Sequence, residues 1–117
     1  MHILYIEDDA SDAQLVKRYV AVTPHQIEVV DAIQDINAIA AHQPDLMLMD
    51  MLIKGERQGY AMVTALRECG YTKPIVALTA LTTAFDRQQA FNAGVNEILS
   101  KPFTIEQLAD LIARYTA

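Results

Sequence analysis

The sequence predicts an α/β fold in which a five-stranded parallel sheet carries helices on both faces. Five short apolar runs alternate strictly with five helix-like segments along the 117 residues, and the connections between them are short. The third and fourth runs are almost continuously apolar, which is typical of parallel strands that are covered on both faces. Polar residues follow several of these runs, so a parallel sheet would bring them to one edge.

The expected strands differ in their surroundings. The run at residues 27–30 is short and partly alternating, so we expect it near an edge of the sheet. Pro74 opens the fourth run, and Pro102 prevents the fifth from extending further. The five strands are expected at residues 2–6, 27–30, 45–50, 75–79 and 96–100.

Prolines and glycines mark the ends of the expected helices. Pro24 and Pro44 follow the first two helices, because proline cannot continue a helix. Gly70 and Gly94 follow the third and fourth, where glycine readily adopts the left-handed backbone that ends a helix. The helices are expected at about residues 11–22, 59–69, 83–93 and 105–115, with a short one between Asp35 and Pro44.

The last helix has the clearest start. Thr104, followed three residues later by Gln107, matches a capping box, in which each side chain binds a backbone amide at the start of the helix. The apolar residues that follow recur at helical spacing, so they should form a buried face. We expect that face to contain Ile105, Leu108, Leu111 and Ile112.

Composition and charge exclude several classes of protein. Residues 1–117 fit one domain, with no room for an output domain, and 52% are hydrophobic, too many for a disordered chain. No apolar stretch reaches the roughly 18 residues of a membrane span. No signal peptide is evident and one cysteine cannot form an internal disulfide, so we expect a cytoplasmic protein. The net charge of −6, without a cluster of Lys or Arg, argues against direct binding to nucleic acid.

Asp50 is the most informative residue, because it closes an apolar run that has the composition of a buried strand. Burying an ionised carboxylate without partners costs several kcal/mol. Candidate partners follow the other runs: Glu7 and Asp8 after the first, Thr79 after the fourth and Lys101 after the fifth.

Glu7, Asp8 and Asp50 form a cluster of hard oxygen ligands if their strands are neighbours. Such carboxylates repel one another unless a cation or protons intervene, and Mg²⁺ suits this set of ligands. Lys101 could pair with Asp50 or with a phosphoryl group on it, and Thr79 offers a hydroxyl donor. Together these groups suit in-line phosphoryl transfer to an aspartate. Taken singly, each residue could instead be a helix cap or part of a salt bridge.

The chain resembles the receiver domain of a response regulator of two-component signalling along essentially its full length. The resemblance implies a flavodoxin-like doubly wound sheet in the strand order 2-1-3-4-5. It rests on the segments at residues 3–9, 44–50, 75–80, 93–94 and 101–103.

The resemblance also implies a metal site beside the phospho-acceptor. Asp50 would accept the phosphoryl group. Mg²⁺, with Mn²⁺ as an alternative, would be held by Glu7, Asp8, Asp50 and the backbone carbonyl of Leu52. Asp8 would be a direct ligand, and Glu7 would often act through water.

The phosphoryl group itself would contact three further residues in such a domain. The Thr79 hydroxyl and the Ala80 amide would bind its oxygens, and Lys101 would pair with its charge. The peptide bond between Lys101 and Pro102 would be cis.

The partners implied by the resemblance are a histidine kinase or histidine phosphotransfer protein, and a downstream protein target or output domain. The domain would catalyse only its own phosphorylation and dephosphorylation, and would otherwise not be an enzyme. The new charge would switch protein–protein interactions through the last two helices and the fifth strand. The sequence leaves open the kinase, the pathway, the oligomeric state including a homodimer, and whether the chain is a stand-alone regulator or a piece of a hybrid protein.

Four features depart from the usual pattern of the family. Lys54 stands where a proline is common, and the loop at residues 53–59 is one residue longer than usual. Ile98 stands where the family usually has an aromatic side chain that couples to the threonine. Leu52 and Leu81 would flank the path of the hydrolytic water and cannot orient it, so we expect a long-lived phosphoryl group.

Three other functions compete with this interpretation. A constitutive, non-phosphorylated interaction module with the same fold is the main alternative, and only the altered loop and Ile98 favour it. A phosphatase with an aspartate nucleophile would need a second acid where Leu52 stands. A flavin carrier would need a phosphate-cradling loop of Ser, Thr and Gly after the first strand, where this chain has acids.

Overall fold

The computed structural model describes residues 1–7, 10–21, 23–30, 43–52, 58–80 and 83–116. Within these ranges five strands form one sheet in the order β2-β1-β3-β4-β5, and every neighbouring pair is parallel. This confirms the expected order and the edge position of the second strand. The strands are β1 (His2–Ile6), β2 (Gln26–Val30), β3 (Leu46–Asp50), β4 (Ile75–Thr79) and β5 (Glu97–Ser100).

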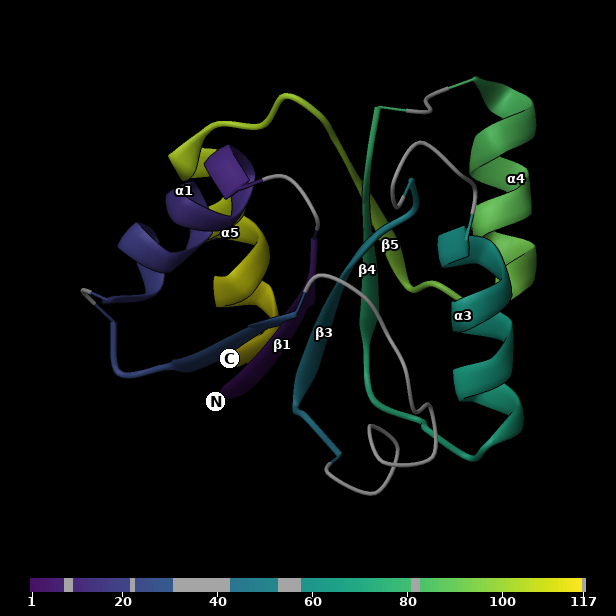
Figure 1. The fold of residues 1–117 in the computed structure, drawn as a ribbon, viewed down its shortest axis with the longest axis horizontal. Coiled ribbons are helices and arrows are strands. Elements are labelled where there is room, and N and C mark those ends of the chain that lie inside the picture. The colour runs from purple at the N-terminus through teal and green to yellow at the C-terminus, as the bar shows by residue number, and fades with distance from the viewer. Residues whose placement is uncertain (8–9, 22, 31–42, 53–57, 81–82, 117) are drawn as a thin grey trace.

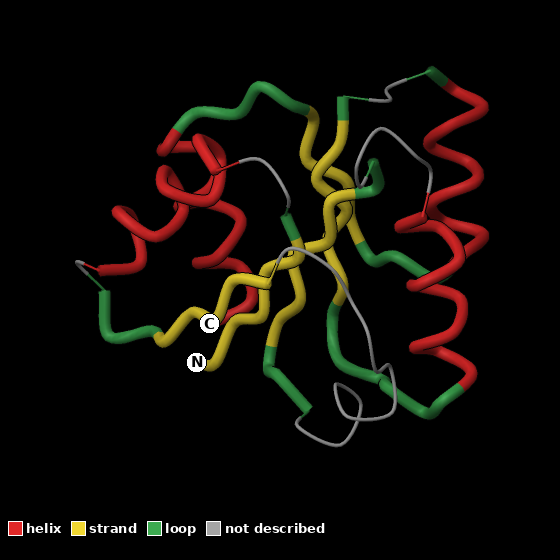
Figure 2. Tube along the Cα trace, in the orientation of Figure 1, coloured by secondary structure: helices red, strands yellow, loops and turns green. Residues whose placement is uncertain are grey.

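Helices cover both faces of the sheet, as Figure 1 shows: α1 and α5 lie on one side, and α3 and α4 lie on the other. The tube view in Figure 2 shows the strands running between these two pairs. The helix expected between Asp35 and Pro44 falls outside the described residues. The helices in the described ranges are α1 (Ala10–Ala21), α3 (Gln58–Glu68), α4 (Ala84–Ala93) and α5 (Ile105–Thr116).

The core has two parts, one on each face of the sheet. Successive strand residues point to opposite faces, so Leu4 and Ile6 join the cluster under α3 and α4, whereas Ile3 and Tyr5 join the cluster under α1 and α5. Every residue of β3 and β4 is buried, as their continuous apolar sequence predicted. The site residues at the ends of these strands therefore rest on a fully buried layer.

The expected ends of α3 and α4 and the expected start of α5 are confirmed. Gly70 and Gly94 adopt φ values of 93° and 122° just after α3 and α4, a backbone region that favours glycine. At the start of α5, the Thr104 amide donates to Gln107 Oε1 (2.8 Å) and the Gln107 amide donates to Thr104 Oγ1 (3.1 Å), which completes the capping box. The expected burial of Ile105 was wrong, because this first residue of α5 lies about one turn before the core contacts begin and is 37% exposed.

Polar contacts tie together the amino ends of the strands. The Arg67 guanidinium donates to the carbonyls of Gly94 (3.0 Å), Tyr71 (2.8 Å) and Lys73 (2.7 Å) and to Asn96 Oδ1 (2.7 Å). These acceptors lie on the segments that lead into β4 and β5, and Arg67 itself comes from the last turn of α3. One side chain therefore fastens a helix to the starts of two strands.

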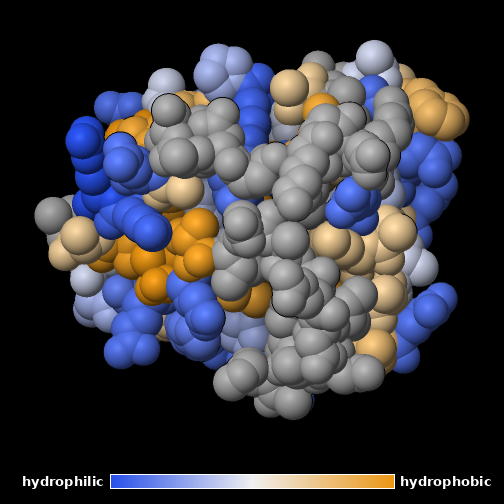
Figure 3. Space-filling view, viewed as in Figure 1, coloured by the Kyte–Doolittle hydropathy of each residue, from blue (hydrophilic) through white to orange (hydrophobic). Residues whose placement is uncertain are grey.

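The surface of the described residues carries both hydrophilic and hydrophobic side chains. In the space-filling view, hydrophilic and hydrophobic residues are intermixed on both sides of the molecule (Figure 3). Phe85 and Phe91, both on α4, are 66% and 46% exposed. None of the helices in the described ranges has the length and apolarity that crossing a bilayer requires.

Candidate functional site

The register of the central strands brings three predicted site residues to the carboxyl edge of the sheet. The pairing of Ile6 with Met49 places Glu7 beside Asp50. Asp50 pairs with the residue before Thr79, so Thr79 flanks it on the other side. Glu7, Asp50 and Thr79 are only 3%, 4% and 2% exposed, so three polar groups meet in a buried position.

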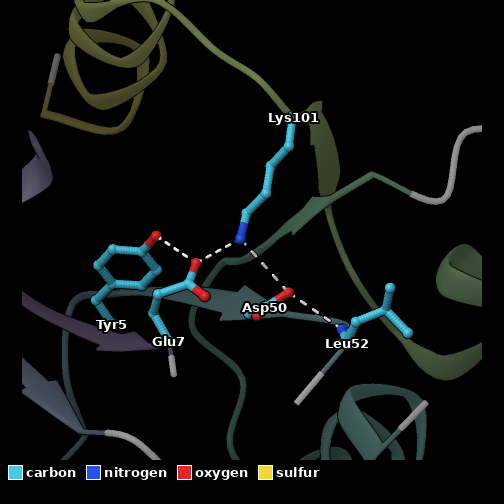
Figure 4. A network of polar contacts seen from close by, with 5 residues as sticks. All are labelled: Tyr5, Glu7, Asp50, Leu52 and Lys101. Atoms are coloured by element: carbon cyan, nitrogen blue, oxygen red, sulfur yellow. Dashed lines mark hydrogen bonds and ion pairs between the residues drawn. The ribbon is translucent and has the colours of Figure 1, made fainter. Parts of the chain in front are cut away.

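Lys101 reaches the same edge from the end of β5. Its amide donates to the Thr79 carbonyl (2.8 Å), and its peptide bond to Pro102 is cis, as the resemblance implied. The Lys101 Nζ lies 2.6 Å from Glu7 Oε2 and 3.7 Å from Asp50 Oδ1 (Figure 4). The lysine therefore pairs with Asp50, as the sequence suggested, but its closer partner is Glu7.

Glu7 has a further donor that sequence analysis missed. The hydroxyl of Tyr5 donates to Glu7 Oε2 over 2.7 Å, and the Tyr5 side chain is fully buried. Tyr5 belongs to an apolar run, so its composition suggested only a core residue. The available signal was its position two residues before Glu7, because residues two apart on a strand share a face.

Asp50 carries an unusual protonation equilibrium. Burial raises its pKa to about 8, and the neighbouring Glu7 adds to this through a hydrogen bond and through its charge. Lys101 and the Leu52 amide, which donates to Asp50 Oδ1 over 3.1 Å, act in the opposite direction but do not offset it. The carboxylates are thus crowded enough that protonation of Asp50 is favoured, a situation that a nearby cation would relieve.

The donor chemistry fits a hard divalent cation such as Mg²⁺. Glu7 and Asp50 present carboxylate oxygens at the same buried edge, and oxygen ligands are those that Mg²⁺ prefers. Within the described ranges no group of three or more His, Cys, Asp or Glu side chains is arranged to hold a metal. The third predicted carboxylate, Asp8, lies outside those ranges, so they supply two of the three expected acidic ligands.

The start of α3 lies directly against the strand end that carries Asp50. A Cβ atom on Gly59 would come within 2.5 Å of Met51 Cα and 2.8 Å of the Asp50 carbonyl oxygen, which is closer than atoms can approach. The Gly59 amide also donates to the Met51 carbonyl (3.3 Å). Gly59, which the sequence placed at the boundary between a loop and a helix, therefore allows the start of α3 to approach the backbone beside Asp50.

The remaining predicted positions are placed only in part. Ala80 follows β4 and is exposed, and Leu52 is half-buried just beyond β3. Ile98 is half-buried and packs against the core cluster under α3 and α4. Lys54 and Leu81 lie outside the described residues.

The protein is thus an open, doubly wound α/β protein with a buried aspartate, a second carboxylate and a lysine at the carboxyl edge of its parallel sheet. In proteins of this class, ligands bind at that edge. The chain belongs to the response regulator receiver domain family, whose family model matches residues 3–113. The resemblance inferred from the sequence is thereby confirmed.

Two curated relatives illustrate the family. The chain is 28% identical over 109 residues to the response regulator MprA of Mycobacterium avium, covering 92% of this chain and 47% of the relative. It is 30% identical over 115 residues to the transcription factor SKN7 of Saccharomyces cerevisiae, covering 97% of this chain and 18% of that protein. The chain thus spans about half the length of the first of these relatives and less of the second.

Solved structures share the fold. A two-component response regulator from Clostridium difficile superposes with a TM-score of 0.88 at 22% identity, covering 99% of this chain and 95% of that one. The receiver domain of the sensor histidine kinase PA1611 from Pseudomonas aeruginosa superposes with a TM-score of 0.83 at 27% identity, covering 97% and 95%. That receiver domain is described with a magnesium ion coordinated in its active site cleft.

Proposed function

We propose that this receiver domain is a phosphorylation-dependent switch in which Asp50 accepts a phosphoryl group in the presence of Mg²⁺. The observation that carries the proposal is the position of Asp50, buried at the sheet edge beside Glu7 and within 3.7 Å of the Lys101 ammonium, with its pKa raised to about 8. The magnesium ion described in the PA1611 receiver domain supports the same assignment of metal.

The metal would be held by Glu7, Asp8, Asp50 and the carbonyl of Leu52. A bound Mg²⁺ would neutralise and orient the phosphoryl oxygens and favour the ionised form of Asp50; Mn²⁺ has the same ligand preferences. The Asp50 oxygen would then form a bond to phosphorus while the phosphorus–nitrogen bond of a phosphohistidine donor breaks. The leaving imidazole would take the electron pair.

The other site residues would stabilise the transferred group. Lys101 would move its charge from Glu7 to the phosphoryl oxygens, and the Thr79 hydroxyl and Ala80 amide would donate to the same oxygens. In this scheme the domain acts on nothing beyond its own phosphorylation and dephosphorylation.

The new charge would change which proteins the domain binds. The phosphoryl group on Asp50 would carry about −1.5 to −2 charge, in place of the single charge of the ionised carboxylate. The elements nearest Thr79 and Lys101 are those that lead into α4 and α5. The exposed Phe85 and Phe91 on α4 make this side suitable for a partner protein or output domain. The donor would be a cytoplasmic histidine kinase or phosphotransfer protein.

Intact-mass spectrometry after incubation with acetyl phosphate and Mg²⁺ tests the proposal. We expect one phosphate adduct on the wild type, which requires Mg²⁺ and is absent from Asp50→Asn. Asp45→Asn is the matched control, because Asp45 is exposed and precedes the opposite end of the same strand; this variant should be labelled like the wild type.

A folded wild type that takes no phosphate from acetyl phosphate or from a phosphohistidine donor would overturn the proposal. The constitutive interaction module would then be the better description. Labelling of Asp50→Asn to the wild-type extent would show that another residue is the acceptor.

A further inference from the structure

We propose that Tyr5 is a positioning residue that orients the Glu7 carboxylate for metal binding, an inference that rests on the proposed function. Tyr5 lies two residues before Glu7, on the same face of the β1 segment. Its hydroxyl donates to Glu7 Oε2 over 2.7 Å, and its side chain is fully buried (Figure 4). The contact therefore joins the core of the protein to the site.

The hydroxyl is not needed to fill space. The Tyr5 ring belongs to the apolar cluster under α1 and α5, together with residues such as Ile3, Leu48 and Val76. A phenylalanine ring would occupy the same position in this cluster. What tyrosine adds is a donor, which a buried phenol must satisfy, and the bonded group is the Glu7 carboxylate.

The geometry also shows how the carboxylate is oriented. Tyr5 and Lys101 both donate to Glu7 Oε2, at 2.7 Å and 2.6 Å. Both donors hold the same oxygen, and the second oxygen of Glu7 lies on the side of Asp50 (Figure 4). That is the side on which a shared cation would lie.

The two donors would have different roles in the proposed reaction. Lys101 would transfer its charge to the phosphoryl group, so its bond to Glu7 would weaken as the reaction proceeds. Tyr5 is buried in the core, and in the proposed reaction it would not contact the phosphoryl group. It can therefore hold Glu7 in place before, during and after transfer.

Hydrogen-bond partners that orient metal ligands typically change metal affinity about 10- to 100-fold when removed. We expect the Mg²⁺ dissociation constant of Tyr5→Phe to rise about tenfold. The Mg²⁺ concentration for half-maximal phosphorylation should rise in step, whereas the labelling rate at saturating Mg²⁺ should change less than about twofold, because the reacting groups are intact.

Tyr71→Phe is the matched control. Tyr71 is 2% exposed, and its hydroxyl donates to the Pro44 carbonyl over 2.7 Å at the opposite edge of the sheet. Each variant loses one hydroxyl from a buried tyrosine that donates over the same distance. Urea unfolding measures the stability loss of each variant, which should be larger for Tyr5→Phe because its acceptor is a carboxylate. A loss of Mg²⁺ affinity that Tyr71→Phe does not share reports the position of Tyr5 rather than general loosening.

The first experiment is a calorimetric Mg²⁺ titration of wild type, Tyr5→Phe, Tyr71→Phe, Glu7→Gln and Tyr5→Phe/Glu7→Gln. Support would be about a tenfold weakening by Tyr5→Phe, a change below about twofold for Tyr71→Phe, and no further effect of Tyr5→Phe once Glu7 is glutamine. The last result would show that Tyr5 acts through Glu7.

Two results would overturn the inference alone: Tyr5→Phe binding Mg²⁺ as tightly as wild type, or Tyr71→Phe weakening it equally. A Tyr5→Phe effect that persists in full in the Glu7→Gln background would also exclude action through Glu7. If the wild type neither binds Mg²⁺ nor accepts phosphate, the proposed function fails and the inference fails with it.

Discussion

Replacing Asp50 with asparagine should stabilise the metal-free protein at neutral pH. Folding buries this carboxyl group beside Glu7 and raises its pKa from 3.8 to about 8. The folded state therefore disfavours the ionised form that the unfolded chain holds at pH 7. An asparagine keeps an oxygen for the Leu52 amide and provides an NH₂ donor for Glu7, so it removes this penalty.

The size of this stabilisation follows from the shift in the pKa of Asp50. One pKa unit corresponds to about 1.4 kcal/mol, and pH 7 lies about three units above 3.8, which gives about 4 kcal/mol. Because Glu7 is part of the same equilibrium, only part of this is recovered, and we expect Asp50→Asn to gain roughly 2–4 kcal/mol at pH 7. For a domain of this size, that is roughly 8–16 °C in Tm.

The titration of Asp50 also predicts how the difference in stability between Asp50→Asn and the wild type changes with pH. Well below pH 3.8 Asp50 is protonated in both the folded and the unfolded wild type, so its ionisation contributes nothing to the difference in stability there. The gap should widen as the pH rises from 3.8 toward 8, where the folded wild type loses its proton, and should be constant above that. Mg²⁺ should narrow the difference in stability, because it would bind the folded wild type more tightly than a variant that lacks the Asp50 carboxylate.

Urea unfolding in EDTA at several pH values measures this gap. Asp110→Asn is the control, because Asp110 is an exposed carboxylate on α5, and its effect should be small at every pH. An Asp50→Asn variant no more stable than wild type at pH 8, or a gap that does not change with pH, would refute the reasoning.

Three further variants test other parts of the structure. Gly59→Ala should lower the free energy of unfolding by about 1–3 kcal/mol, measured in urea, and should slow the labelling of Asp50, measured by intact mass. Gly70→Ala is the control: no atom lies within 4 Å of its added Cβ, so in the same assays it should change stability but not labelling. Arg67→Lys should cost about 2–4 kcal/mol in urea unfolding, because an ammonium cannot reproduce four divergent hydrogen bonds; a loss below about 0.5 kcal/mol would contradict this. Leu52→Asn should speed loss of the phosphoryl group several-fold, measured as decay of the adduct, and an unchanged rate would show that the apolar side chain does not protect it.

Much of the fold could be predicted because the sequence patterns of single strands and helix ends agree with how those elements pack in the structure. The continuous apolar sequence of β3 and β4 corresponds to strands buried on both faces, and the glycines and capping box mark helix ends that the structure confirms. Ile105 was misjudged, because periodicity alone does not show where along a helix the contact with the sheet begins.

The residues that form the site could be predicted from the sequence, but the contacts between their side chains could not. Parallel strands bring their carboxyl ends together, so strand-end polar residues were enough to place Asp50, Thr79 and Lys101. Sequence could not show that Lys101 lies closer to Glu7 than to Asp50, since that depends on side-chain conformations across 94 residues of chain. It also missed Tyr5, whose hydroxyl is one polar atom on a side chain that otherwise has the properties of a core residue.

The Arg67 contacts at the amino edge have a consequence for how this domain can diversify. The carboxyl edge gathers buried charge at an energetic cost, while the amino edge, at the far end of the same strands, contributes hydrogen bonds that no proposed chemistry requires. The amino edge is therefore a place where the stability of the domain can change without altering the groups proposed to carry the phosphoryl chemistry. Substitutions at Arg67 should shift the Tm and leave the phosphorylation rate of Asp50 unchanged.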